Sequence, residues 1–218
     1  MRLAAGLALV VLTSASAHAA DRRVPVDPTL PPWNAVAKVQ TNIGTRCSGA
    51  LIAPAVVLTA AHCLYNRLTG ALLQPVSLHV MFGYERAGYR WHRLVTRVTV
   101  GSGFDGAKTR PQVSDWARLD LAEPVPVVPL PLYDGAVAAG MAVALAGYNQ
   151  DRAQLLMADT ACRLLQTGTA FVRHDCAATR GTSGAPLLVR QGDGWAVVGI
   201  NIAAGSQTNV ALRPPTLE

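Results

Sequence analysis

The chain has 218 residues, of which 50% are hydrophobic and 15% are charged, and its formal net charge is +6. This composition excludes a disordered chain and suits one large all-β domain or two smaller halves. The arginines that carry the positive charge are scattered, without a basic run or an aromatic-interleaved patch, so we expect no nucleic-acid partner.

The first stretch, Met1 to Ala19, has the features of a secretory signal. Arg2 supplies a short positive region, Leu3 to Leu12 is apolar, and Ala17-His18-Ala19 places small residues at the cleavage positions. The apolar run is shorter than the roughly 20 residues that span a bilayer. We therefore expect a protein exported to the extracellular space or the periplasm, beginning near Ala20, with no membrane contact after the signal is removed.

The four cysteines suit an oxidising compartment and fall into two close pairs along the sequence, Cys47 with Cys63 and Cys162 with Cys176. Three disulfide pairings are formally possible. Metal binding is the alternative, but no CxxC or HxxxH spacing supports it. We expect neither a metal nor another cofactor.

Residues 20–32 are polar and rich in proline, and we expect them to form an extended lead-in. Within this lead-in, Arg22-Arg23 is expected to be a solvated pair at a flexible terminus. Short runs of β-branched and aromatic residues then predict a first series of strands, at 36–40, 48–53, 56–59, 76–84, 91–100 and 116–121.

Residues 122–135 contain four prolines among valines and leucines, which predicts a connector between two halves. A second series of short strands follows, at 139–148, 155–160, 162–165, 169–172, 187–190 and 195–202. Many short strands with Gly/Pro turns and no long run of helical periodicity indicate an all-β sandwich or barrel. We assign residues 33–121 to the first half and 136–218 to the second.

Three motifs stand out, and they contain a histidine, an aspartate and a serine in that order. They are Thr59-Ala60-Ala61-His62-Cys63, Ser114-Asp115-Trp116-Ala117 and Gly181-Thr182-Ser183-Gly184-Ala185-Pro186. Together they resemble the trypsin-like (chymotrypsin-fold) serine proteases. The local sequence of the motifs is similar to that of the bacterial secreted branch related to glutamyl endopeptidases. The resemblance spans residues 33–212. It implies two six-stranded Greek-key β-barrels, with the active site in the cleft between them.

The resemblance also implies roles for the three residues. Ser183 would be the nucleophile and His62 the general base, while Asp115 would orient and stabilise the imidazole. The backbone N–H groups of Gly181 and Ser183 would form the oxyanion hole. The competing nucleophile elbow of α/β-hydrolases needs GxSxG, whereas this chain has Ala185 at the fifth position and no histidine after the serine.

Other acidic residues compete with Asp115 for the third role, namely Asp105, Asp120 and Asp175. Asp120 shares a strand face with Arg118, so a surface ion pair accounts for it. The cysteines are expected to pair as Cys47–Cys63, which would fix the turn that carries His62, and as Cys162–Cys176, which would fix the loop that leads to Ser183.

The chain departs from the digestive members of the family at Thr182, where those enzymes carry an aspartate that pairs with a newly cut N-terminus. Threonine cannot form that ion pair, so we expect no such switch. The substrate pocket implied by the resemblance is lined by Ala177, Ala178, Asn201, Ile202 and Ala203. It lacks the aspartate of trypsin-like enzymes and the histidine of glutamyl endopeptidases, which predicts a preference for uncharged side chains.

The resemblance thus implies a secreted serine endopeptidase that acts on polypeptides, and we expect a monomer. The alternative is an inactive secreted binding protein on the same scaffold. Because inactive relatives usually lose a triad residue or the oxyanion glycine and none is missing here, the sequence favours the enzyme.

Overall fold

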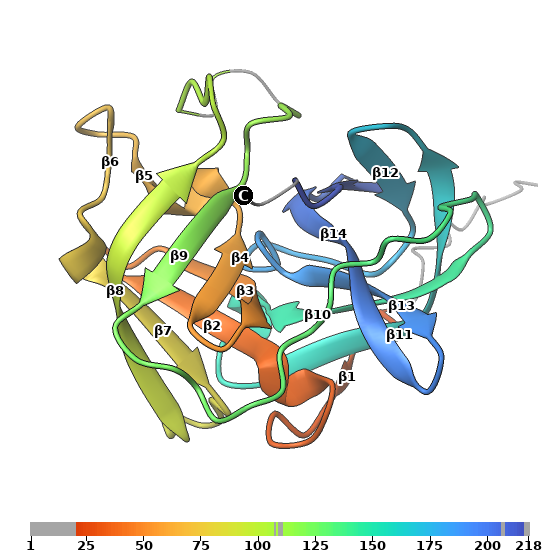
Figure 1. Ribbon diagram of the computed structural model, residues 1–218, viewed down its shortest axis with the longest axis horizontal. Helices are drawn as coiled ribbons and strands as arrows, with labels where there is room; N and C mark the ends of the chain where they lie inside the picture. The colour runs from red at the N-terminus through yellow and green to blue at the C-terminus, as the bar shows by residue number, and fades with distance from the viewer. Residues whose placement is uncertain (1–20, 107, 109–110, 206–207, 216–218) are drawn as a thin grey trace, which may run out of the picture.

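The computed structural model describes residues 21–106, 108, 111–205 and 208–215, and it places two β-barrels side by side (Figure 1). The proposed secretory signal lies outside the described residues. Among the described residues, no helix has the length and apolar character needed to cross a membrane.

The first barrel is closed by six antiparallel strands in the order β2-β3-β4-β9-β8-β7. Their bounds are β2 (Val36–Thr41), β3 (Arg46–Ala53), β4 (Val56–Thr59), β7 (Leu78–Phe82), β8 (Trp91–Val100) and β9 (Ala117–Leu121). The alternation expected for a half-buried strand is clear in β9, where Ala117, Leu119 and Leu121 are buried and the residues between them are partly exposed. The apolar set faces the barrel interior.

The second barrel has six strands that form a closed ring, because β11 pairs with both β10 and β12. The ring consists of β10 (Ala142–Tyr148), β11 (Leu156–Thr167), β12 (Phe171–His174), β13 (Pro186–Gln191), β14 (Gly194–Ala203) and β15 (Asn209–Leu212). A two-residue strand near the N-terminus, β1 (Val24–Pro25), adds to the outer edge of β11. Val24 and Pro25 are therefore fixed to the second barrel, although the first barrel follows them in the chain.

Four short 3-10 turns and one small hairpin complete the described secondary structure. The turns are η1 (Trp33–Ala35), η2 (Ala61–Leu64), η3 (Pro75–Ser77) and η4 (Gln150–Arg152), and the hairpin pairs β5 (Tyr65–Asn66) with β6 (Ala71–Leu72). The proline-rich residues 122–135 run between the barrels and join the second one through an isolated bridge between Leu132 and Val197 (Figure 1). We keep them as the proposed connector.

The structure differs from the sequence expectations at several elements. Instead of the two strands expected at 155–160 and 162–165, residues 156–167 form one bent strand, β11, because register shifts let it pair with β10 and β12 in turn. The predicted strand at 76–84 is shorter, since Pro75–Ser77 form a 3-10 turn. Strand β15 was not predicted at all.

The expectation that Arg22 and Arg23 are solvated is wrong. Arg23 is buried, with 7% of its side chain exposed, and Arg22 forms an ion pair with the fully buried Asp159 at 3.1 Å. A guanidinium can be buried only if its donors are satisfied, and Asp21, Asp151 and Thr179 accept the hydrogen bonds of Arg23 here. The chain thus makes specific side-chain contacts from Asp21 onward.

Candidate active site

His62 and Asp115 leave the same edge of the first barrel. Strands β4 and β9 are antiparallel neighbours with Thr59 opposite Ala117. His62 lies three residues after Thr59 and Asp115 two residues before Ala117, so the pairing brings them together. The disulfide Cys47–Cys63 holds the turn that carries His62 against β3, as predicted.

The contact between the two side chains uses both carboxylate oxygens. His62 Nδ1 lies 2.8 Å from Asp115 Oδ2 and 3.0 Å from Oδ1, and the backbone N–H of His62 donates to Oδ1 at 2.9 Å. A carboxylate only accepts hydrogen bonds, so the ring proton belongs on Nδ1 and Nε2 keeps a free lone pair. Asp115 is 1% exposed and His62 retains 11% side-chain exposure. The histidine can therefore accept a proton at Nε2.

Asp115 is the described carboxylate that contacts His62, and the competing residues are engaged elsewhere. Asp120 pairs with Arg118 at 2.8 Å and also with Arg97. Asp175 accepts the backbone N–H of Arg163 at 2.7 Å.

Ser183 lies in the loop between β12 and β13 of the second barrel, and the residue after it touches the first barrel. Gly184 has φ +79°, and a Cβ there would stand 2.1 Å from Thr59 Oγ1 and 3.0 Å from the nitrogen of Ala60. Only glycine permits this approach. Because His62 follows Ala60 by two residues, the same contact brings Ser183 beside the histidine turn. No hydrogen bond links Ser183 to His62 within the described part of the chain, as in many ligand-free sites whose catalytic bonds are long.

The proposed oxyanion segment has the backbone that its role needs. Gly181 has φ +96°, and a Cβ there would stand 2.4 Å from the carbonyl oxygen of Tyr148. Within the described residues, the N–H groups of Gly181 and Ser183 donate to no protein acceptor. Both are therefore available to a substrate oxygen.

Ser48 is a residue of the site that the sequence analysis missed. It is fully buried on β3, its N–H donates to the carbonyl of Ser183 at 2.8 Å, and its hydroxyl donates to the carbonyl of Gly181 at 3.0 Å. The hydroxyl also accepts the N–H of Tyr148 at 2.8 Å. One serine of the first barrel thus fixes two carbonyls of the loop that contains Ser183. A polar residue inside the buried run of β3 was the available signal.

The predicted pocket residues lie in the first part of this loop and at the end of β14. Ala177 and Ala178 are partly exposed, whereas Asn201 and Ile202 are almost completely buried. The Asn201 side chain accepts a hydrogen bond from His174 Nε2 at 3.1 Å and donates to the carbonyl of Thr182 at 3.2 Å. The side-chain amide of Asn201 is therefore already hydrogen-bonded within the protein.

The predicted disulfide Cys162–Cys176 is also present at the start of the loop. Beside it, the buried carboxylate of Asp159 accepts the N–H of Ala177 at 2.7 Å and is neutralised by Arg22. The carbonyl of Asp175 accepts a further bond from Arg22 at 2.6 Å. The N-terminal segment thus supports the loop that contains the predicted pocket wall.

Comparison with known proteins decides the family. The sequence model of the trypsin-like peptidase domain matches residues 47–200, well over half of the chain. The chain belongs to the trypsin-like peptidases. This match includes all three motifs and most of the strands of both barrels.

Two relatives of this trypsin-like peptidase agree with the resemblance. A glutamyl endopeptidase of Bacillus licheniformis is 28% identical over 106 residues, which are 48% of this chain and 32% of that protein. The alignment therefore spans about a third of the curated relative. A solved structure of a Glu endopeptidase in complex with MPD superposes with a TM-score of 0.78 at 20% identity, covering 90% of this chain and 92% of that one. The two-barrel chymotrypsin fold is thereby established.

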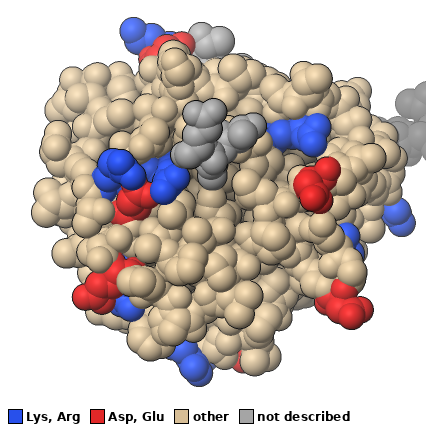
Figure 2. Space-filling model, viewed as in Figure 1, with Lys and Arg blue, Asp and Glu red and all other residues tan. Residues whose placement is uncertain are grey.

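Among the residues that the structure describes, no group of three or more His, Cys, Asp or Glu side chains is arranged to hold a metal ion. On the face shown in Figure 2, Lys and Arg side chains are scattered, and several have acidic neighbours.

Proposed function

We propose that this trypsin-like peptidase is a secreted serine endopeptidase, with Ser183 as nucleophile, His62 as general base and Asp115 as the group that orients it. The observation that supports this most is the His62–Asp115 pair, which directs the free Nε2 lone pair away from a buried carboxylate. The close approach of Gly184 to Thr59 and Ala60 supports the placement of the nucleophile beside it.

The chemistry follows from these positions. The hydroxyl of Ser183 attacks the peptide carbonyl while His62 Nε2 takes its proton, and the carbonyl oxygen gains the negative charge that the N–H groups of Gly181 and Ser183 stabilise. His62 then gives the proton to the leaving amine, which leaves an acyl-enzyme on Ser183. Water, activated by His62, releases the new carboxyl group and restores the serine.

The pocket favours uncharged side chains on the amino side of the cut bond. Ala177 offers no carboxylate for lysine or arginine, and an unpaired cation buried there would cost several kcal/mol. Asn201 is hydrogen-bonded to His174 and Thr182, so it has little capacity left to bind a glutamate. Arg180, the nearby cation, is exposed.

Secretion rests on the proposed signal and on two disulfides, which persist in oxidising compartments. The proposed substrate is a polypeptide, and the protein is proposed to act as a monomer.

A mixture-based peptide library tests the activity and the preference together. We expect wild-type protein to cut mainly after small or apolar residues, and Ser183→Ala and His62→Ala to cut nothing above background while keeping the wild-type circular dichroism spectrum. The two variants should lose most of the rate enhancement because each removes one half of the proton transfer.

Cleavage that persists in Ser183→Ala would show that the nucleophile is wrong. Dominant cutting after Arg or Lys would contradict the pocket assignment while leaving the triad intact, and dominant cutting after Glu would do the same and point to Arg180 or Asn201. A wild-type protein that cuts nothing under any condition would favour the inactive binding protein.

A further inference from the structure

One hydrogen bond sets the direction of the proposed oxyanion donor at Gly181. The backbone N–H of Gln150, in η4, donates to the carbonyl of Arg180 at 2.6 Å. In a planar trans peptide the C=O and the following N–H point in opposite directions. Holding the Arg180 carbonyl toward η4 therefore turns the N–H of Gly181 to the opposite side, where it has no acceptor in the described part of the chain.

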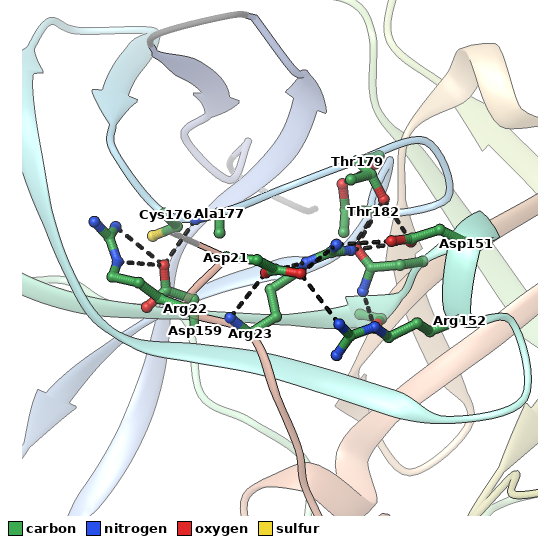
Figure 3. A network of polar contacts seen from close by, with 12 residues as sticks. Asp21, Arg22, Arg23, Asp151, Arg152, Asp159, Cys176, Ala177, Thr179 and Thr182 are labelled. Carbon is green, nitrogen blue, oxygen red and sulfur yellow. Dashed lines mark hydrogen bonds and ion pairs between the residues drawn. The ribbon is translucent and has the colours of Figure 1, made fainter. Parts of the chain in front are cut away.

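The side chain of Arg23 bridges the two residues that flank this hydrogen bond. Its guanidinium donates to both carboxylate oxygens of Asp151, at 3.0 and 2.7 Å, and to Thr179 Oγ1 at 3.1 Å. Asp151 adjoins Gln150, and Thr179 adjoins Arg180. Figure 3 shows the Arg23 side chain between Asp21 and Asp151, with Thr179 close to Asp151. The N-terminal segment thus clamps η4 to the nucleophile loop.

The clamp is built on a bidentate ion pair between Arg23 and Asp151. Arg23 meets Asp151 with two parallel donors, which is the geometry of the strongest charge-assisted pairs. Its hydrogen bond is the main reason that the pKa of Asp151 falls to about 2. Asp21 binds the other side of the same guanidinium at 2.8 and 2.9 Å, and Arg152 reaches Asp21 at 3.3 Å (Figure 3).

The contact extends through the loop to the residue before the nucleophile. The carbonyl of Thr179 accepts the hydroxyl of Thr182 at 2.6 Å and its N–H at 3.2 Å. The residue that replaces the family's aspartate at this position therefore binds the segment that Arg23 holds. This arrangement differs from an ion pair between an aspartate and a new N-terminus.

We propose that Arg23 is a positioning residue that keeps the peptide between Arg180 and Gly181 in the orientation that completes the oxyanion hole. The inference rests on the proposed peptidase activity. Arg23 touches neither substrate nor reacting atoms; it acts through Asp151 and Thr179. Without it, the direct hydrogen bond from Thr179 Oγ1 to Asp151 at 3.0 Å is a remaining side-chain link between the loop and η4. The Arg180 carbonyl is then held less firmly, and the Gly181 N–H can turn away from the substrate oxygen.

Kinetics of purified Arg23→Gln protein test this proposal. We expect kcat to fall by roughly 10- to 100-fold with KM almost unchanged. This loss is smaller than the loss of about 10²–10³ in kcat that follows complete removal of an oxyanion donor, because the donor is displaced and not removed. Affinity for a peptide aldehyde, which mimics the tetrahedral intermediate, should fall by a similar factor. Arg23→Lys should recover part of kcat because it keeps the charge but lacks the fork.

Two further variants separate positioning from general destabilisation. Arg97→Gln removes an exposed ion pair with Asp120 on the first barrel and should leave kcat at the wild-type value. Asp151→Asn should lower kcat as Arg23→Gln does, and the double variant should be no worse than the more damaging single variant, because both break one clamp. Melting temperatures measured for every variant set the assay temperature below all transitions.

The outcomes distinguish the proposal from the activity on which it rests. If wild-type protein hydrolyses peptides and Arg23→Gln matches Arg97→Gln in kcat, the clamp has no positioning role. A loss confined to KM, or full additivity of Arg23→Gln and Asp151→Asn, would also overturn it. If Arg23→Gln does not fold, Arg23→Lys with wild-type kcat and aldehyde affinity would overturn it. A wild-type protein without hydrolysis would instead refute the proposed function.

Discussion

At the scale of single residues, the buried His174, which donates to Asn201 of the predicted pocket, affects the stability of the protein at acidic pH. It is fully buried, and its Nδ1 has no hydrogen-bond partner among the described residues. Burial lowers the pKa of His174 to about 4, although the hydrogen bond to Asn201 and the charges of Asp175 and Asp159 act in the opposite direction. The folded protein therefore keeps His174 neutral in mildly acidic solution.

This burial predicts a loss of stability on acidification. Below the ordinary histidine pKa of about 6.5, the unfolded chain binds a proton that the folded chain excludes, so the free energy of unfolding falls from pH 6.5 to about pH 4. The total loss from this group is on the order of 3 kcal/mol. Urea unfolding of wild-type and His174→Gln protein at several pH values checks it. An equal slope in both proteins between pH 6.5 and 4.5 would show that His174 is not the cause.

The residue scale also shows what the sequence could and could not predict. The motifs around His62, Asp115 and Ser183 are local strings, and the structure brings the first two into contact. Ser48 was missed and Arg23 was expected to be solvated, because their partners lie more than a hundred residues away in the sequence. A sequence pattern carries no trace of such long-range hydrogen bonds.

At the scale of elements, the loop that contains Ser183 requires a glycine at position 184, where the two barrels meet. A methyl group on Gly184 would overlap Thr59 Oγ1 and the carbonyl of Ser48, at 2.1 and 2.2 Å, in addition to straining a backbone at φ +79°. We expect Gly184→Ala to destabilise the protein by about 2–5 kcal/mol and to reduce kcat, because the overlap pushes Ser183 away from the histidine turn.

Gly192 provides the matched control, because it has φ +57° in the β13–β14 hairpin with nothing within 4 Å of its added Cβ. Gly192→Ala should lose only the strain energy, about 1–2 kcal/mol, and keep wild-type kcat. Denaturant unfolding and steady-state kinetics of both variants test the pair. Similar losses of stability at the two positions would mean that close packing at Gly184 is unimportant.

Strand prediction succeeded where alternation or a buried run was strong, as in β4 and β9. It failed at β15, a four-residue strand whose sequence, Asn209–Leu212, shows no alternation because all four residues are buried. The two strands expected between residues 155 and 165 merge into β11 because pairing with two neighbours continues through the bend. In these cases tertiary pairing, and not local pattern, decides the element.

At the scale of the whole molecule, the two barrels supply different parts of one proposed site. The first barrel contributes His62, Asp115 and the buried Ser48, and the second contributes the loop that contains Ser183. The family and the two-barrel fold are established by the match over residues 47–200 and by a TM-score of 0.78 to a Glu endopeptidase structure. The central claim that remains to be measured is that Ser183 is a nucleophile activated by the histidine of the other barrel.

Labelling with a fluorophosphonate probe, followed by mass spectrometry of the modified peptide, measures this most directly. The account predicts a single adduct on Ser183 that forms with wild-type protein, is absent from Ser183→Ala and is strongly slowed in His62→Ala. An adduct on another residue, or equal labelling of wild-type and His62→Ala protein, would contradict it.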